Sequence, residues 1–119
     1  MGIASNFHVQ NHPLIRKQDL PNLPKELQED FDEIFLDILS EDPYDRGGFP
    51  GHILTRDPLK GWRTFDIVDE HKIAYRLVYK IIDTLSIKKV EVISFDSHDS
   101  AYSKAEARAP KEIVRKWGR

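Results

Sequence analysis

Arg76 is the residue whose type and position in the sequence best suit it to bind an anion. It lies within residues 72–82, where apolar and polar side chains alternate, and it falls on the face opposite the main apolar stripe. A guanidinium is always charged, and its planar fork of N–H donors fits the oxygens of a phosphate. The alternative is a structural role, in which Arg76 forms a salt bridge across the sheet to Asp66 or Glu91.

His98 and Tyr102 form a second candidate group. They are four residues apart where a helix is expected to begin, so they should share one face of that helix. An imidazole can donate or accept a proton near neutral pH, and a tyrosine beside it can orient a phosphate or stack on a base. The alternative is an ordinary helix start, with Ser97 or Asp99 as the N-cap and Tyr102 packed on the sheet.

Further cations lie near these residues in the sequence. Lys60 and Arg63 stand at the start of the preceding predicted strand, and Arg63 would form a cationic clamp with Arg76 if both side chains pointed to the same face. Lys104 and Arg108 continue a basic stripe along the C-terminal helix, and we expect them, with Lys60, to contact RNA. The alternative for such long cations is that they are ordinary solvated surface residues.

The residues that several other kinds of catalytic or metal site require are absent from the chain. The chain has no cysteine, so it has no thiolate nucleophile, no disulfide framework and no cysteine-based metal site. The five histidines, at positions 8, 12, 52, 71 and 98, show no close metal-ligand pairing. The motifs of serine hydrolases, phosphate-binding loops and dinucleotide sites are also missing. We therefore expect neither a metal nor a small-molecule cofactor.

The elements that must position these residues begin with helices. Residues 24–42 carry one apolar stripe at spacings of three and four, formed by Leu27, Phe31, Ile34, Phe35, Ile38 and Leu39. The opposite face is strongly acidic, and we interpret it as a solvated surface. Prolines punctuate residues 12–23, so any helix there is short or interrupted. Residues 6–10 could form a short strand.

After a long loop, the hydrophobic pattern changes from the helical period to the alternation that is typical of strands. Residues 62–68 and 72–82 alternate around a polar turn, which predicts a hairpin, and residues 87–95 predict a third strand. Alanines after Asp99 predict a terminal helix that Pro110 interrupts. A last turn or tail follows, with Ile113, Val114 and Trp117.

This order predicts a single α+β domain over residues 1–119. We expect a small antiparallel sheet, made of an N-terminal strand and a three-stranded C-terminal meander. The early helices should pack on one face, and a short helix should end the chain. Residues 42–57 form a long loop rich in Pro and Gly, and loops of this length are often functional.

Charge is divided unevenly along the chain. Residues 1–59 hold 5 Lys/Arg and 11 Asp/Glu, a net −6, whereas residues 60–119 hold 13 Lys/Arg and 9 Asp/Glu, a net +4. This asymmetry suggests that the C-terminal half meets an anion such as a nucleic acid, although a solvated basic face would look the same. No signal-peptide pattern or membrane-length apolar run is present, so we expect a cytoplasmic protein with no membrane partner.

Three segments resemble a known family. AYRLVYKIID, VEVISF and SHDSAYSKAEARA are similar to the C-terminal core of the RelE/ParE toxin superfamily, and PNLPKELQEDFDEIFLDIL resembles its paired early helices. Two departures stand out. Phe65 replaces a second lysine of RelE, and the segment before Tyr102 is polar and acidic rather than basic.

The resemblance implies specific roles. Arg76 takes the position of the phosphate-binding strand arginine, Tyr102 that of the C-terminal aromatic, and His98 that of a histidine found in some members. Arg63 stands roughly where the family has a basic residue on the preceding strand. RelE-like members are ribosome-dependent ribonucleases held inactive by an antitoxin, whereas ParE-like members poison DNA gyrase.

We therefore expect a toxin that cuts mRNA on the ribosome, with a cognate antitoxin as partner. Attack of a 2′-hydroxyl on the adjacent phosphate needs positive charge at the phosphate, a base and an acid. Arg76 and Arg63 would bind the phosphate, His98 would carry a proton, and Lys60 and His71 are weak candidates for the second proton carrier. Two alternatives stay open: a ParE-like or inert relative that binds a protein, and an interaction domain whose acidic helix meets a basic partner.

Overall fold

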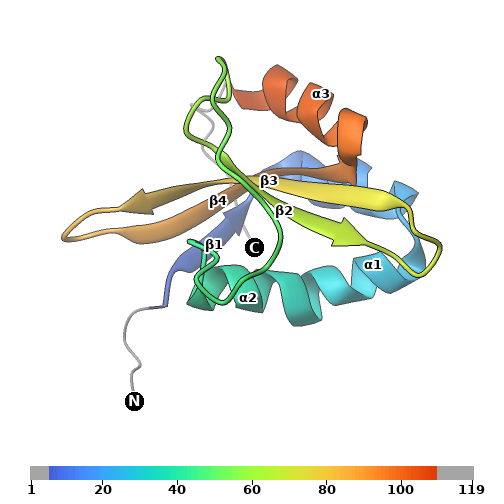
Figure 1. Ribbon diagram of the computed structural model, residues 1–119, viewed down its shortest axis with the longest axis horizontal. Coiled ribbons are helices and arrows are strands. Elements are labelled where there is room, and N and C mark those ends of the chain that lie inside the picture. Colours follow the sequence, from blue (N-terminus) through green and yellow to red (C-terminus); the bar gives the residue numbers. More distant parts are fainter. Residues whose placement is uncertain (1–5, 110–119) are drawn as a thin grey trace.

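The fold is α+β, as the sequence predicted. The computed structural model describes residues 6–109, and Figure 1 shows a sheet with helical layers on its two sides. The acidic helical segment runs without a break through α1 (Lys25–Asp30), η3 (Phe31–Phe35) and α2 (Leu36–Glu41). The predicted last turn at residues 113–117 lies outside the described residues. Among those described, no helix is long and apolar enough to cross a membrane.

The sheet has four strands in the order β1-β4-β3-β2. The predicted meander is present as β2 (Arg63–Val68), β3 (Ala74–Asp83) and β4 (Lys88–Ser97), each antiparallel to the next. The N-terminal strand, β1 (His8–Asn11), instead runs parallel to β4, so the sheet is mixed rather than wholly antiparallel. No tight turn joins β1 to a neighbouring strand, so nothing forces it to be antiparallel.

Short helical turns follow β1. They are η1 (Ile15–Asp19) and η2 (Leu20–Asn22), and Pro21 lies in the second. Ile15 and Leu20 are buried in the main core, which explains how a segment punctuated by prolines still packs tightly. Asp19, between them, is a fully buried carboxylate. It binds side chains of the C-terminal helix, as described below.

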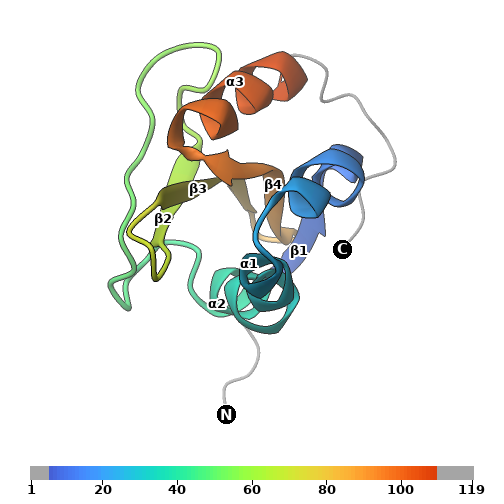
Figure 2. The ribbon, with the colours of Figure 1, turned by 90° about the vertical axis from the view of Figure 1, so that its right-hand side faces the viewer.

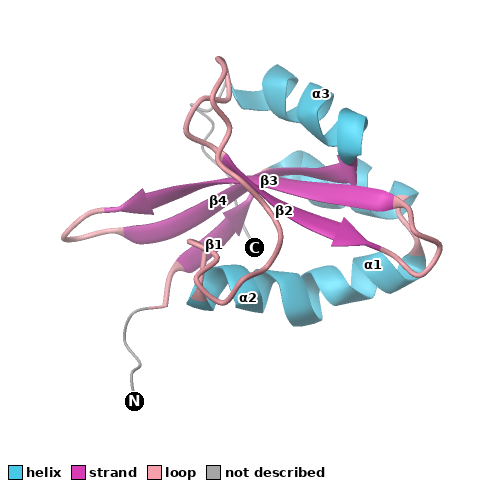
Figure 3. Cartoon of the chain, viewed as in Figure 1, coloured by secondary structure: helices cyan, strands magenta, loops and turns pink. Residues whose placement is uncertain are grey.

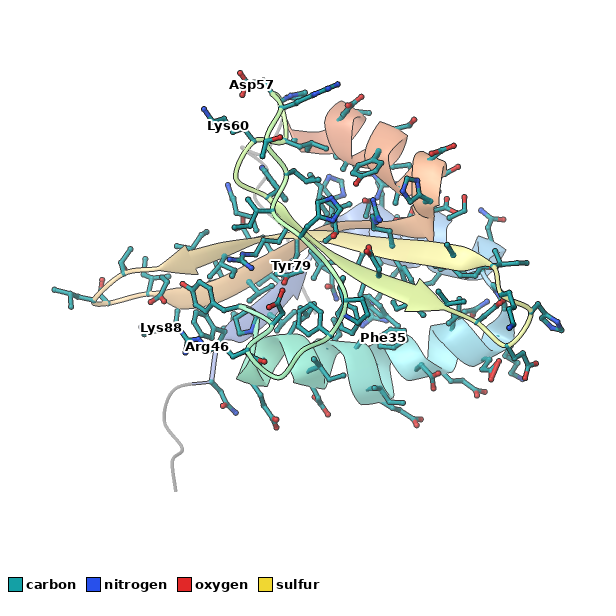
Figure 4. The ribbon with its side chains drawn as sticks, viewed as in Figure 1. Phe35, Arg46, Asp57, Lys60, Tyr79 and Lys88 are labelled. Atoms are coloured by element: carbon teal, nitrogen blue, oxygen red, sulfur yellow. The ribbon has the colours of Figure 1, made fainter. Side chains whose placement is uncertain are left out.

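The larger core lies between the sheet and the acidic helical segment. Phe31 stacks on Phe95 of β4 with ring centroids 5.6 Å apart, and Phe35 meets Phe65 of β2 edge-on at 5.5 Å. Figure 4 shows Phe35 between the helices and the sheet. Ile34 was expected in the apolar stripe but is 43% exposed, because the stripe that contacts the sheet is narrower than the periodicity suggested.

A smaller core lies on the opposite face, beneath α3 (His98–Arg108). Ala101 and Ala105 are fully buried, and their small side chains let α3 lie close to Val78 and Ile93 of the sheet. Figure 2 shows α3 on the side of the sheet away from α1 and α2. Arg76, His98 and Tyr102 all belong to this face or to the helix that covers it.

The long loop before β2 runs along the outer edge of the sheet, as the pink trace in Figure 3 shows. Thr64 N–H donates to the His52 carbonyl (3.0 Å), and Asp66 N–H donates to the Pro50 carbonyl (2.9 Å). A Cβ at Gly51 would collide with the carbonyl oxygen of Thr64, so only glycine allows this approach. The loop is thereby held against β2 and carried up to α3.

Candidate functional site

Arg76 is 8% exposed and points to the α3 side of the sheet. Its Nε donates to Asp66 Oδ1 at 2.6 Å, and its Nη1 donates to the Tyr102 hydroxyl. Its guanidinium carbon lies 5.0 Å from the centroid of the Tyr102 ring. The salt bridge to Asp66 that was left open at the sequence level is therefore formed, and Arg76 also touches a predicted site residue.

His98 and Tyr102 share a face of α3, as their spacing predicted. Their rings meet edge to face with centroids 5.3 Å apart. His98 is half exposed, and its Nδ1 lies 2.9 Å from Asp99 Oδ1. Ser97 is the N-cap residue, but its side chain makes no capping hydrogen bond. Arg76, Tyr102 and His98 thus form a continuous row that ends at the surface.

Arg63 does not join this row, and the expected clamp with Arg76 is not formed. It pairs in register with Tyr79, whose side chain lies in the larger core. Its guanidinium carbon sits 5.3 Å from the Tyr44 ring centroid on that same side. Arg63 and Asp66 are three residues apart in one strand, so the pleat sends them to opposite faces, and Arg76 follows Asp66.

Arg108 was expected to contact RNA, with a solvated surface position as the alternative, but its side chain is buried. It is 5% exposed and forms a two-pronged ion pair with Asp19, with both N–O distances 2.9 Å. The buried Asp19 carboxylate also accepts the Phe95 N–H (3.0 Å) and the Lys104 ammonium (3.1 Å). Arg108 therefore attaches α3 to the rest of the molecule through Asp19.

Lys104 is also committed to carboxylates. Besides Asp19, it contacts Asp96 of β4 at 2.6 Å. Burial lowers the pKa of Lys104, but the hydrogen bonds to Asp96 and Asp19 outweigh this effect and raise the pKa above its usual value. Lys104 is therefore a charged, largely satisfied cation beside the row rather than an open contact for RNA. Sequence reasoning missed Asp19, because nothing in the surrounding residues marks a buried carboxylate.

Lys60 is exposed on the long loop. Figure 4 places it with Asp57 at the loop tip, next to α3. Within residues 6–109, Lys60 forms no ion pair. It remains an available cation, but it stands apart from the row formed by Arg76, Tyr102 and His98.

A cleft of about 540 Å³ opens between the long loop and α3. Its walls are His52, Ile53, Leu54, Thr55, Arg56, Asp57 and Leu59 from the loop, and Tyr102 and Glu106 from the helix. Tyr102 therefore belongs both to this cleft and to the row with Arg76. Sequence reasoning did not single out Arg56 or Glu106, although the length of the loop and the i, i+4 spacing of Tyr102 and Glu106 were signals of a shared wall.

Within residues 6–109, no three His, Asp or Glu side chains lie together in a way that could hold a metal ion. Comparison with models of known protein families, with curated proteins and with solved structures found no match for the chain. The likeness to RelE/ParE toxins therefore stays a prediction that rests on the residues quoted for it.

Proposed function

We propose that this chain is a cytoplasmic RelE-type toxin that cleaves RNA through Arg76, Tyr102 and His98. The observation that carries the proposal is the contact between these three side chains, which join a cation, a hydroxyl and an exposed imidazole. They come from two distant parts of the sequence, strand β3 and helix α3. A phosphate placed at this row would have a positive charge at one end of it and a proton carrier at the other.

The reaction would be an attack within the RNA strand. The 2′-oxygen forms a bond to phosphorus, the bond from phosphorus to the 5′-oxygen breaks, and a 2′,3′-cyclic phosphate and a 5′-hydroxyl result. Arg76 would stabilise the extra negative charge on the phosphate. His98 would take the proton from the 2′-hydroxyl while water protonates the leaving 5′-oxygen, or it would protonate that oxygen while water takes the 2′-proton. Tyr102 would orient the phosphate.

Arg76 keeps capacity for a phosphate despite its partners. A guanidinium presents several N–H donors, of which Asp66 takes one and Tyr102 another. The remaining donors are those that would bind an incoming phosphate oxygen. Asp66 partly neutralises the cation, so substrate binding must rely on further contacts, and the resemblance implies that the ribosome supplies them by presenting the mRNA.

The test is cleavage of an RNA by purified protein, with and without ribosomes, and analysis of the new ends. His98→Gln should lower the rate by about 10²- to 10⁴-fold if the imidazole carries a proton. His8→Gln is the matched control, since His8 is exposed on β1 and takes no part in the row. A 2′-deoxy substitution at the cut site should abolish cleavage. Full activity of a folded His98→Gln protein would remove His98 from the mechanism.

One observation favours a second function, binding to a protein target without cleavage, as in ParE-like toxins. Arg76, Lys104 and Arg108 all face carboxylates of the chain itself. This arrangement weakens the attraction for a polyanion and suits a structural role. Expression without an antitoxin distinguishes the two functions, because growth arrest with intact mRNA would support the protein-binding alternative.

A further inference from the structure

We infer that the cleft between the long loop and α3 binds a guanine base of the RNA strand whose phosphate lies at Arg76; the inference rests on the proposed function. The first observation is the position of Tyr102. Tyr102 lines the cleft with its side chain, while its hydroxyl accepts a hydrogen bond from Arg76. A nucleotide with its phosphate at Arg76 would therefore have its base next to the cleft.

The size and the walls of the cleft suit a base. Its volume of about 540 Å³ falls within the range of small-ligand sites. Leu54 and Leu59 give it an apolar side, and the Tyr102 ring gives an aromatic one. Unpaired RNA bases are commonly bound by stacking on aromatic side chains. These walls would hold the flat faces of a base and leave its edges to the polar residues.

The polar residues of the two walls select among bases. Glu106 on α3 and Arg56 on the loop are both exposed, and neither forms an ion pair with another residue in the range 6–109. Guanine offers two adjacent donors, N1–H and the 2-amino group, which match the two oxygens of a carboxylate. Its O6 and N7 acceptors match an arginine. Adenine and cytosine present one donor beside an acceptor, and uracil presents one donor between two carbonyls, so each fits Glu106 less well.

The test is binding of short RNA that cannot be cut. Uridine hexamers with 2′-fluoro sugars would carry guanine, inosine, adenine or cytosine at one position, and fluorescence anisotropy would give each Kd. We expect guanine to bind on the order of 10-fold more tightly than adenine, cytosine or uracil. Inosine, which lacks the 2-amino group, should fall between. Glu106→Gln should remove most of the preference, and Arg56→Gln should reduce it.

Glu33→Gln is the matched control, because Glu33 is exposed on η3 at the opposite face of the sheet. It should leave the preference unchanged. Equal affinity for all hexamers, or a preference that survives Glu106→Gln in a folded protein, would overturn the inference. Free GMP that binds as tightly as the guanine hexamer would overturn the assignment to an RNA strand.

The binding test does not depend on cleavage. If guanine is preferred but no RNA is ever cut, the base site stands and the proposed nuclease activity fails. If RNA is cut at Arg76 and His98 without any base preference in binding, the nuclease stands and the base site fails.

Discussion

Asp66 sets how much positive charge Arg76 can offer to a ligand. Its carboxylate lies 2.6 Å from the Arg76 Nε, and both side chains are largely shielded from solvent. The sequence offered this salt bridge and a phosphate site as alternatives, and the geometry allows both at once. An arginine held by one carboxylate is pre-oriented. Because the carboxylate partly neutralises it, its electrostatic attraction for a distant anion is weak.

The variant Asp66→Asn keeps a hydrogen-bond acceptor and removes the negative charge. We expect RNA affinity to rise by about fivefold, the equivalent of ~1 kcal/mol for a partly buried ion pair. Anisotropy titrations with an uncleavable RNA would measure it. Glu29→Gln, on the exposed side of α1, makes the same change in net charge and should have a smaller effect. An equal effect of the two variants would mean that only net charge matters.

His12 gives the fold a sensitivity to acid. It is 9% exposed, and its Nδ1 accepts the Leu14 N–H at 3.1 Å. Burial lowers the pKa of His12, and the nearby charge of Arg108 lowers it further, while Asp19 partly opposes both. The unfolded chain therefore takes up this proton at a higher pH than the folded chain does. Its contribution to stability is present above pH 6.5 and is lost as the pH falls through the lower folded pKa.

The variant His12→Asn retains an acceptor for the Leu14 N–H but does not titrate. We expect the wild type to lose more unfolding free energy than this variant between pH 7.5 and pH 5, conditions that bracket the ordinary histidine range of about 6.5. Urea unfolding at a series of pH values would measure the difference. Parallel curves for the two proteins would show that His12 is not the group responsible.

At the scale of elements, one buried carboxylate fixes the position of α3. Asp19, at the end of η1, holds Lys104 and Arg108 of the helix and the backbone of β4. The helix that presents His98 and Tyr102 is thereby tied to a segment almost eighty residues earlier in the chain. Displacement of α3 would separate Tyr102 from Arg76.

Asp19→Asn should lower the free energy of unfolding by about 3–5 kcal/mol, because it leaves the buried Arg108 without a counter-charge. The paired replacement Asp19→Leu with Arg108→Met removes both charges and should recover much of that loss. Urea unfolding would test stability, and hydrogen exchange of the α3 amides would test whether the helix loosens. A double variant no more stable than Asp19→Asn would contradict this account.

Gly51 is the residue that lets the long loop approach β2. In Gly51→Ala the new methyl group collides with the Thr64 carbonyl, so the loop must move away from the strand. We expect a stability loss of at least about 1 kcal/mol and a weaker guanine preference, since residues 52–59 form one wall of the cleft. Gly47→Ala is the control, because its added carbon would meet only the Asp42 carboxylate at 3.1 Å. Similar losses in both variants would mean that loop glycines act through chain flexibility alone.

The elements themselves were predictable, because each has a clear period. The stripe of the acidic helices and the alternation in β3 are local patterns, and both match the observed faces apart from Ile34. The direction of β1, the face of Arg63 and the burial of Arg108 were not predictable from the sequence. Each depends on a partner distant in the chain, respectively β4, Tyr79 and Asp19.

At the scale of the whole molecule, charge is sorted by layer. The sheet separates α1, η3 and α2 from α3 and the loop tip (Figures 1 and 2). Exposed acidic residues gather on the first layer: Glu26, Glu29, Glu33, Asp37 and Glu41. On the α3 side of the sheet, Arg56 and Lys60 have no ion pair among residues 6–109, and Arg76 of β3 has one. An RNA strand should therefore approach from the α3 side and meet few available cations.

This arrangement predicts a weak dependence of RNA binding on salt. If about three phosphates are neutralised, the slope of log K against log salt should be about −2 for a single strand. RNA-binding titrations at potassium chloride concentrations from about 50 to about 300 mM would measure this slope. A slope steeper than about −4 would mean that many more cations contact the RNA than these residues provide.

The part of the long loop that is bonded to β2 also affects how copies of the protein associate with one another. An open strand edge, with its row of unsatisfied N–H and C=O groups, invites pairing with another chain and can start aggregation. Here the N–H groups of Thr64 and Asp66 on that edge are already bonded to the loop. The loop that forms a wall of the cleft therefore also protects the β2 edge of the sheet from pairing with another copy. Variants that release it should lose solubility at high concentration before they lose their secondary structure.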